Sequence, residues 1–359
     1  MKQKHKLALI VGLPVLGVII IILFLMASCC RRKTEEIGSK DIETNFEFKE
    51  REGTDKEDLI RFHGAEDLTA FDILEAPGEV IGKSSYGSLY RANLLRSNSL
   101  ALLRFVRPTC TLRIKEVVPI VELLGSLRHP NLVPLLAFYA GSRGEKLLVY
   151  PFYPWGTLAE LIRDGNGEAH RWPIIHKVSI GIASGLSYLH NDLEMPVIHG
   201  NIKSKNVMLD RHYQPFLSDV GLHLLLNTAA AQQMLEASAA EGYKAPELIK
   251  MKDVNEESDI YGFGVILLEL LTGKDPIDEN PTPDQDFHLP NAIRTAILDD
   301  QIRELYHPEI IRGQSSDERA LTEDRIFRMF QLAMACCSPS PSLRPDMKQI
   351  VSKLEEIGN

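Results

Sequence analysis

The chain has 359 residues, 25% of them charged, and a formal net charge of −9 at pH 7. This length allows one two-lobed domain with appendages, and the acidic balance argues against a protein that holds nucleic acid through its phosphates. We therefore expect no nucleic-acid partner. The five cysteines show neither metal-ligand spacing nor a disulfide framework, which favours a reducing compartment.

The first predicted element is an uncharged, apolar run from Leu7 to Ala27. About 20 such residues are needed to cross hydrocarbon as a helix, whereas the apolar part of a signal peptide has only about 7–15. The run therefore predicts a transmembrane anchor over 1–33, with its span at 7–27 between basic flanks; a cleaved signal is the alternative. Cys29 and Cys30, just after the span, are either S-acylated or unmodified thiols.

A polar segment follows the anchor, with ten acidic and four basic residues over Thr34–Asp58. Such a composition buries too little apolar surface to fold. We predict a disordered acidic juxtamembrane linker over 34–64 and a folded domain over 65–357.

The folded domain divides into a strand-rich part and a helix-rich part. Leu59–Phe62, Leu100–Val106 and Lys146–Tyr150 predict strands of a small antiparallel sheet, and Ile114–Ser126 predicts the one long helix of an N-lobe at 65–150. The helices predicted for a C-lobe at 151–357 are Leu158–Arg163, Trp172–Asn191, Asp259–Thr272 and Arg325–Cys336. Strands followed by helices indicate an α+β fold.

Six short motifs follow one another between Ala65 and Leu354. In chain order they are Gly82-Lys83-Ser84-Ser85-Tyr86-Gly87-Ser88-Leu89, Ala101-Leu102-Leu103-Arg104, His199-Gly200-Asn201-Ile202-Lys203-Ser204-Lys205-Asn206, Ser218-Asp219-Val220-Gly221, Lys244-Ala245-Pro246-Glu247 and Pro341-Ser342-Leu343-Arg344-Pro345. Each motif is weak evidence alone, but the ordered set is specific.

The set resembles the kinase domain of plant receptor-like kinases, particularly the leucine-rich-repeat receptor-like group. Within that group it is most similar to the transmembrane kinase-like proteins that are regarded as inactive. The resemblance implies a bilobal protein-kinase fold in the cytosol behind a single membrane span, at the plasma membrane. It also implies other receptor-like kinases or signalling proteins as partners, and ATP with Mg²⁺ as the cofactor.

The resemblance assigns the residues that would contact a nucleotide. They are Ile81, Gly82, Gly87, Leu89, Arg104, Lys203, Asn206 and Asp219. Asn206 and Asp219 match the two residues that hold Mg²⁺, and Lys203 matches the catalytic-loop lysine near the transferred phosphate.

Several positions depart from the family pattern, and the most serious is Asn201. It stands where the family has the Asp that accepts the proton of the substrate hydroxyl, and a carboxamide has no basic lone pair to replace it. Ser84 replaces the middle glycine of the phosphate loop, and Ile120 replaces the N-lobe glutamate. No complete catalytic set remains, although Lys203 is retained.

Arg104 replaces the lysine that binds the α- and β-phosphates, and a planar guanidinium does not substitute freely for an ammonium. With Ile120 apolar, we expect Glu116 or Glu122 to pair with Arg104; an ordinary solvated arginine is the alternative.

Other retained motifs predict architecture. Glu247 and Arg344 match a buried ion pair of the C-lobe, and Asp259 matches the residue that holds the catalytic loop. The Ala-rich middle of the segment 219–247 predicts a helical turn rather than a charged switch.

Three functions fit this sequence. The favoured one is a membrane-anchored pseudokinase that acts as a scaffold or allosteric partner, with weak or no ATP binding. The alternatives are a slow but active Ser/Thr protein kinase and an interaction module without nucleotide binding.

Overall fold

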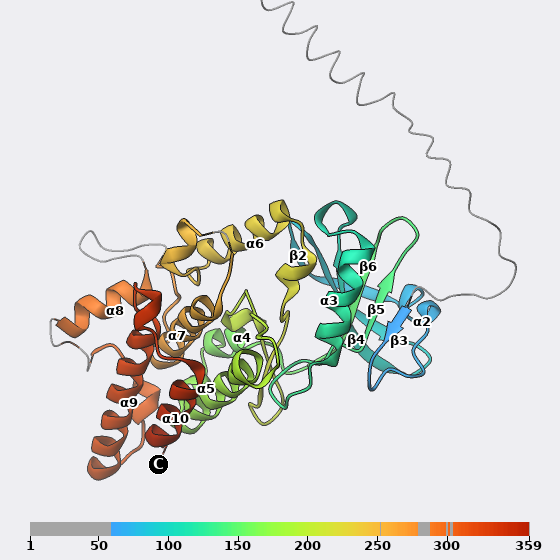
Figure 1. Ribbon diagram of the computed structural model, residues 1–359. Helices are drawn as coiled ribbons and strands as arrows, with labels where there is room; N and C mark the ends of the chain where they lie inside the picture. The colour runs from blue at the N-terminus through green and yellow to red at the C-terminus, as the bar shows by residue number, and fades with distance from the viewer. Residues whose placement is uncertain (1–58, 252, 279–287, 299–300, 302–303, 359) are drawn as a thin grey trace, which may run out of the picture. The chain divides into compact units, whose positions relative to one another are not determined.

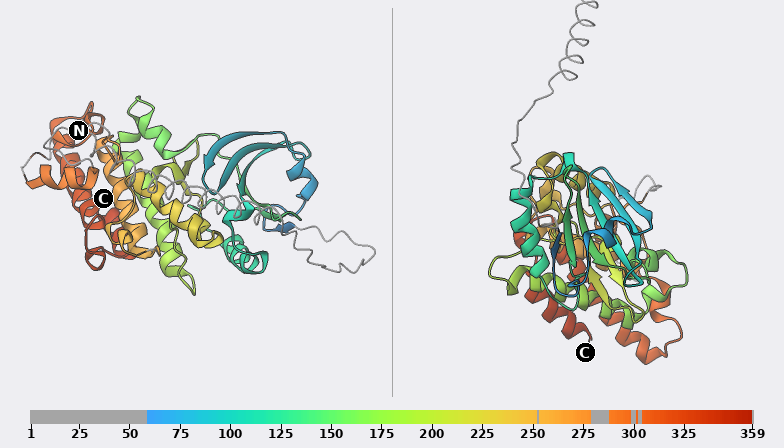
Figure 2. Two further views of the ribbon diagram at one scale, coloured as in Figure 1. Left: turned by 90° about the horizontal axis from the view of Figure 1, so that it is seen from above. Right: turned by 90° about the vertical axis from the view of Figure 1, so that its right-hand side faces the viewer.

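The computed structural model describes residues 59–251, 253–278, 288–298, 301 and 304–358. The first part of the fold is a six-stranded antiparallel sheet with the strand order β1-β5-β6-β4-β3-β2 (Figures 1 and 2). Its strands are β1 (Leu59–Arg61), β2 (Gly78–Ser84), β3 (Gly87–Leu94), β4 (Ser99–Val106), β5 (Ala137–Ala140) and β6 (Lys146–Pro151). The expected strand-rich N-lobe is confirmed.

Strand β1 corrects the expected end of the linker. Leu59 pairs with Tyr139 of β5, and its side chain is buried in a small apolar cluster of the N-lobe. The linker expected over 34–64 therefore ends before Leu59, because these residues complete one edge of the sheet. The rest of that linker lies outside the described residues.

Helix α3 (Ile114–Ser126) is the long helix of the N-lobe and has the predicted bounds. A capping box between Arg113 and Glu116 starts it, and its buried residues include Val117, Val121 and Leu124. This spacing of three and four residues places one apolar stripe against the core. A shorter helix, α2 (Ala70–Leu74), precedes the β2–β3 hairpin.

The C-lobe is mainly helical. Its longer helices are α4 (Leu158–Arg163), α5 (Trp172–Ser187), α6 (Thr228–Ala240), α7 (Glu256–Thr272), α8 (Leu289–Leu298), α9 (Ser316–Cys336) and α10 (Met347–Gly358). The predicted helices are confirmed, although α7 and α9 begin before the predicted positions. A short hairpin, β7 (Val207–Leu209) with β8 (Pro215–Leu217), lies between α5 and α6 in the chain.

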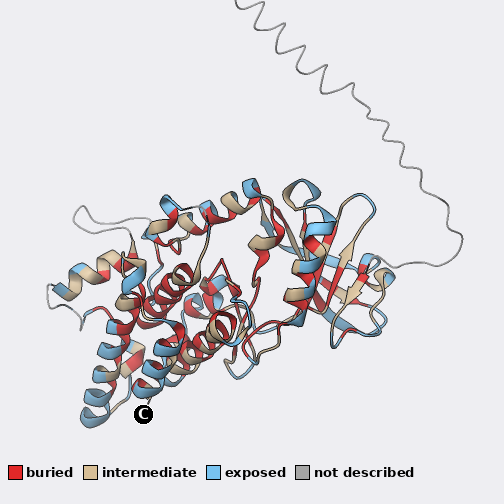
Figure 3. Ribbon diagram, viewed as in Figure 1, coloured by how far each residue is buried: buried red, intermediate tan, exposed pale blue. Residues whose placement is uncertain are grey.

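Helix α7 forms the centre of this lobe, and Figure 3 shows its residues buried on all sides. Asn255 caps its first turn, and Gly273 ends it with a left-handed φ of 69°. An apolar helix without a polar face is typical of a buried core element. It gives the segments around it a rigid support.

No helix within the described ranges is long and apolar enough to cross a membrane. The span expected at 7–27, together with Cys29 and Cys30, lies outside those ranges.

Candidate functional site

The β2–β3 hairpin is the expected phosphate loop. Its two glycines, Gly82 and Gly87, differ in whether the surrounding structure leaves room for a side chain. A Cβ atom on Gly87 would lie 2.0 Å from the carbonyl oxygen of Phe105, so only glycine lets β3 approach β4 there. A Cβ on Gly82 would make an ordinary contact with Leu89, 3.4 Å away. Ile81 is exposed beside Gly82, at an irregularity in the β2–β3 pairing. Gly87 is therefore required by sheet packing, whatever else the hairpin binds.

Tyr86, at the tip of this hairpin, is buried and belongs to the same apolar cluster as Leu102 and Val106. Burial, and then the nearby charge of Asp219, raises the pKa of its hydroxyl. The hydroxyl of Tyr86 thus interacts electrostatically with the carboxylate that was expected to hold Mg²⁺. Tyr86 was not predicted as a site residue, and the bulky aromatic between Ser85 and Gly87 was the available signal.

Arg104, on β4 of the N-lobe, and Asp219 of the C-lobe form an ion pair between the two lobes. The Nη2 atom of Arg104 donates to a carboxylate oxygen of Asp219, and the two side chains are only 12% and 7% exposed. The prediction that Glu116 or Glu122 pairs with Arg104 is wrong. Both glutamates are exposed on α3, and Glu116 instead accepts from the backbone N–H of Arg113 at 3.1 Å.

The ion pair between Arg104 and Asp219 determines whether a metal ion can bind at this site. A guanidinium bound to Asp219 supplies positive charge where a divalent cation would need a free carboxylate. Asn206, the second expected ligand, donates its amide group to the backbone oxygen of Asn201 at 2.8 Å. In this arrangement the residues do not fit a Mg²⁺ ion, because Arg104 would have to move first.

Asn201 is buried in the catalytic loop, which is the segment 199–206. Its backbone N–H donates to His199 Nδ1 at 3.3 Å, and its side-chain oxygen has no hydrogen-bond partner among the described residues. A carboxamide oxygen can accept a hydrogen bond but cannot remove a proton near neutral pH. The position therefore lacks a general base.

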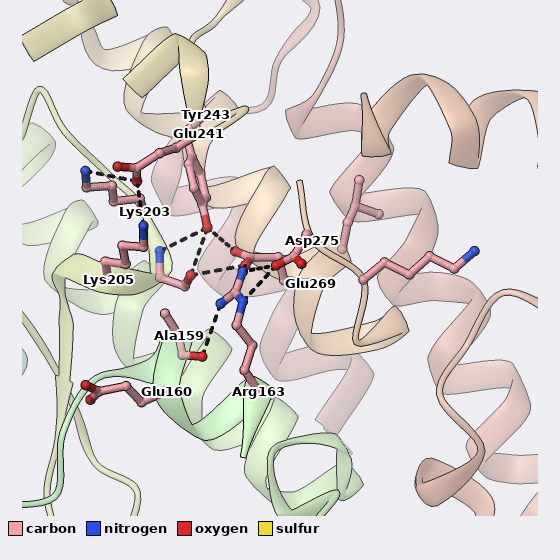
Figure 4. A network of polar contacts seen from close by, with 12 residues as sticks. Ala159, Glu160, Arg163, Lys203, Lys205, Glu241, Tyr243, Glu269 and Asp275 are labelled. Carbon is pink, nitrogen blue, oxygen red and sulfur yellow. Dashed lines mark hydrogen bonds and ion pairs between the residues drawn. The ribbon is translucent and has the colours of Figure 1, made fainter. Parts of the chain in front are cut away.

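Lys203, the retained lysine, is held by the segment that follows α6. Its Nζ lies 3.1 Å from a carboxylate oxygen of Glu241, and Nζ of Lys205 lies 3.6 Å from the same oxygen (Figure 4). Glu241 directly follows α6, the helix that stands where only a helical turn was predicted. Glu241 was not predicted from the sequence, since nothing in the chain order indicates which lysine it meets.

Asp259 holds the catalytic loop as predicted. Its carboxylate accepts the backbone N–H groups of His199 and Gly200 at 2.7 and 2.9 Å, and His190 Nε2 lies 3.0 Å away. Burial disfavours the ionised carboxyl, but these hydrogen bonds outweigh it and lower the pKa of Asp259. The loop is thus fixed by a buried carboxylate on α7.

Gly200 and His223 fit each other closely. Gly200 has a left-handed φ of 77°, and a Cβ atom there would lie 2.3 Å from Nδ1 of His223. The imidazole therefore takes the space into which a side chain at position 200 would extend.

A second polar network joins the C-lobe segments around Glu269 (Figure 4). Tyr243 and Ser204 both donate to its buried carboxylate, and Arg163 lies 3.3 Å away and also binds Asp275. Burial raises the pKa of Glu269 to about 7, while these donors act in the opposite direction. The network links α4, the catalytic-loop segment, the segment after α6 and α7.

The predicted ion pair of the C-lobe is confirmed. The guanidinium of Arg344 donates two hydrogen bonds to Glu247, at 2.6 and 2.8 Å, and a third to the backbone oxygen of Glu257. The Arg344 side chain is fully buried and that of Glu247 is 9% exposed. Ile120, in contrast, packs against the main apolar cluster and has no polar role.

A strand-rich lobe, a helical lobe and a loop held by Asp259 together define a protein-kinase fold. Residues 76–354 match the family described as protein tyrosine and serine/threonine kinase, and the chain belongs to this family. The resemblance that the motifs indicated is confirmed.

Curated relatives include a kinase-like protein and receptor kinases described as probably inactive. A putative kinase-like protein of Arabidopsis thaliana, TMKL1, is 39% identical over 91% of this chain and 48% of its own length. A probable inactive receptor kinase from the same plant is 31% identical over 99% of this chain and 59% of its own length. The chain thus spans about half the length of these curated relatives.

Two solved structures share the fold. The kinase domain of maize SIRK1, bound to AMP-PNP, aligns with a TM-score of 0.73 at 28% identity, covering 84% of this chain and 100% of that one. The pseudokinase domain of BIR2, an immune regulator, aligns with a TM-score of 0.64 at 29% identity, covering 78% and 80%. One similar domain is thus known with a nucleotide analogue and another is described as a pseudokinase.

Proposed function

We propose that this chain is a membrane-anchored receptor-like pseudokinase that acts as a scaffold or allosteric partner of other receptor-like kinases. The observation that carries the proposal is the buried pair between Arg104 and Asp219. It ties up the carboxylate that would hold Mg²⁺ and the side chain that would hold the phosphates. The kinase-like domain is proposed to lie in the cytosol beside the plasma membrane.

The proposal also rests on Asn201 and Lys203. Loss of a general base alone costs roughly 10²–10⁴-fold in rate, and phosphoryl transfer depends mainly on positioning and electrostatics. Here both requirements are affected, because the base is absent and Lys203 is held by Glu241. The description of BIR2 as a pseudokinase supports this reading, while the maize domain bound to AMP-PNP shows that the fold itself can hold a nucleotide. Weak ATP binding after a movement of Arg104 is therefore part of the proposal.

The full-length chain in detergent is expected to transfer no phosphate above background to itself or to a generic Ser/Thr substrate. Radiolabelled ATP measures this directly. Asn201→Asp alone is expected to remain inactive, since Arg104 still occupies Asp219. Incorporation of label by the wild-type chain that disappears in Asp219→Asn would favour the slow-kinase alternative instead.

The membrane anchor is expected to keep the full chain in the pellet after alkaline-carbonate extraction of membranes. This expectation rests on the apolar run from Leu7 to Ala27. In sealed vesicles with the cytosolic face outward, added protease should degrade the domain beyond Lys33. Recovery in the supernatant contradicts the anchor, and protection of the domain contradicts its orientation.

A further inference from the structure

A pocket of about 520 Å³ is lined by residues of the N-lobe. The turn between β5 and β6 forms one wall, and the segment from Pro108 to the start of α3 forms the other. We call it the Lys146 pocket after its most buried charged residue.

Lys146 carries a charge that the fold does not neutralise. The residue is only 7% exposed, and its Nζ donates to Thr111 Oγ1 at 2.6 Å and to the backbone oxygen of Gly144 at 3.3 Å. Among the described residues, no carboxylate lies within ion-pairing distance of it. Burial accordingly lowers the pKa of its ammonium group. A buried ammonium without a counter-charge is unfavourable for folding. An anion that binds from solution would therefore stabilise the folded domain.

The other charged residues that line the pocket are paired. Arg113 lines it, and its guanidinium lies 3.0 Å from a carboxylate oxygen of Glu116 in the first turn of α3. Glu145 is the one carboxylate among the lining residues, and it accepts a hydrogen bond from Arg143 at 2.7 Å. Lys146 is therefore the lining charge that no ion pair among the described residues neutralises.

We propose that the Lys146 pocket binds the phosphate group of a phosphoserine or phosphothreonine on a partner protein. A compact lysine ammonium suits phosphate as a point charge, and the Lys146 ammonium, which has three protons and two protein acceptors, keeps one proton for a phosphate oxygen. The pocket is larger than an inorganic ion requires, and Leu112 and Ile114 offer apolar contacts to the residues that flank a phosphorylated side chain. This inference goes beyond the proposed function, since it holds for an active or an inactive domain.

The binding test uses the full-length chain in detergent micelles and a fluorescein-labelled pool of degenerate nonapeptides with a fixed central phosphoserine. Fluorescence anisotropy should detect binding of this pool and at least tenfold weaker binding of the same pool with serine. Lys146→Met should weaken binding about 10- to 100-fold, as expected for the loss of a charge-assisted hydrogen bond. Arg143→Met, an exposed neighbour in the same turn, is the matched control and should change binding less than about threefold.

A stability measurement separates a binding role of Lys146 from a bracing role. If the ammonium is kept for an anion, Lys146→Met should unfold at the same temperature as wild type or higher. The phosphopeptide pool should raise the unfolding temperature of wild type and not that of the variant. A lower unfolding temperature for Lys146→Met together with unchanged peptide binding would overturn the proposal. Displacement of the peptide pool by inorganic phosphate at equal concentration would overturn its assignment to a partner protein.

Discussion

Replacing Arg344 with alanine is expected to lower the free energy of unfolding by about 3–5 kcal/mol, which is the usual cost of removing one partner of a buried ion pair. The variant leaves the Glu247 carboxylate buried with no guanidinium beside it. It also removes the hydrogen bond to Glu257 and the contact of the guanidinium with the ring of Tyr261, 5.1 Å away. The effect is large because three segments of the C-lobe meet at this one side chain.

Urea unfolding of the full chain in detergent, followed by tryptophan fluorescence, measures this loss. Trp172 on α5 is buried and reports on the C-lobe. Arg328→Ala is the matched control, because its 2.8 Å pair with Asp324 is exposed and such pairs contribute about 0.5 kcal/mol or less. Equal effects of the two variants would show that the Glu247 pair does not stabilise the lobe.

Asp219→Asn is expected to destabilise the domain by about 3 kcal/mol even without nucleotide, because it leaves the buried Arg104 charge without its partner. Asparagine is the right replacement here, since Asp219 has a left-handed φ of 60° that asparagine tolerates better than most residues. Adding Arg104→Met should recover most of the lost stability by removing the orphaned charge.

The same variants test nucleotide binding. Arg104→Met alone frees the Asp219 carboxylate, so we expect a Mg²⁺-dependent rise in unfolding temperature with ATP in this variant and little in wild type. A neutral effect of Asp219→Asn, combined with a strong Mg²⁺-ATP shift in wild type, would mean that Asp219 serves a metal in solution. The buried ion pair between Arg104 and Asp219 would then not represent the conformation that binds nucleotide.

The sequence predicted the architecture well because local signals specify it. Helix α3 has the predicted bounds, since its apolar stripe and its capping box lie within a few residues of each other. The roles of Asp259 and of the pair between Glu247 and Arg344 were also predicted, through motifs at fixed places in the chain order.

The partner of Arg104 could not be predicted in the same way. A nearby glutamate on α3 was expected, but the carboxylate that pairs with Arg104 lies 115 positions later in the chain. Which carboxylate pairs with Arg104 depends on how the two lobes meet. It also depends on the exposure of Glu116 and Glu122, because water can solvate their carboxylates instead. Glu241 was missed for the same reason, since its pairing with Lys203 exists only once α6 has folded.

The contact between Gly200 and His223 bears on whether this domain could regain the family pattern by mutation. The His-Arg-Asp pattern of the family has arginine at position 200, and a single change of Gly200 to arginine would drive its Cβ into the imidazole ring. Removing the ring first would open a void beside the catalytic loop, with no gain until the second change arrives. Either order passes through an intermediate worse than the starting protein. Gly200 and His223 are therefore difficult to replace one at a time, and the loss of activity that we propose would be hard to reverse by single substitutions.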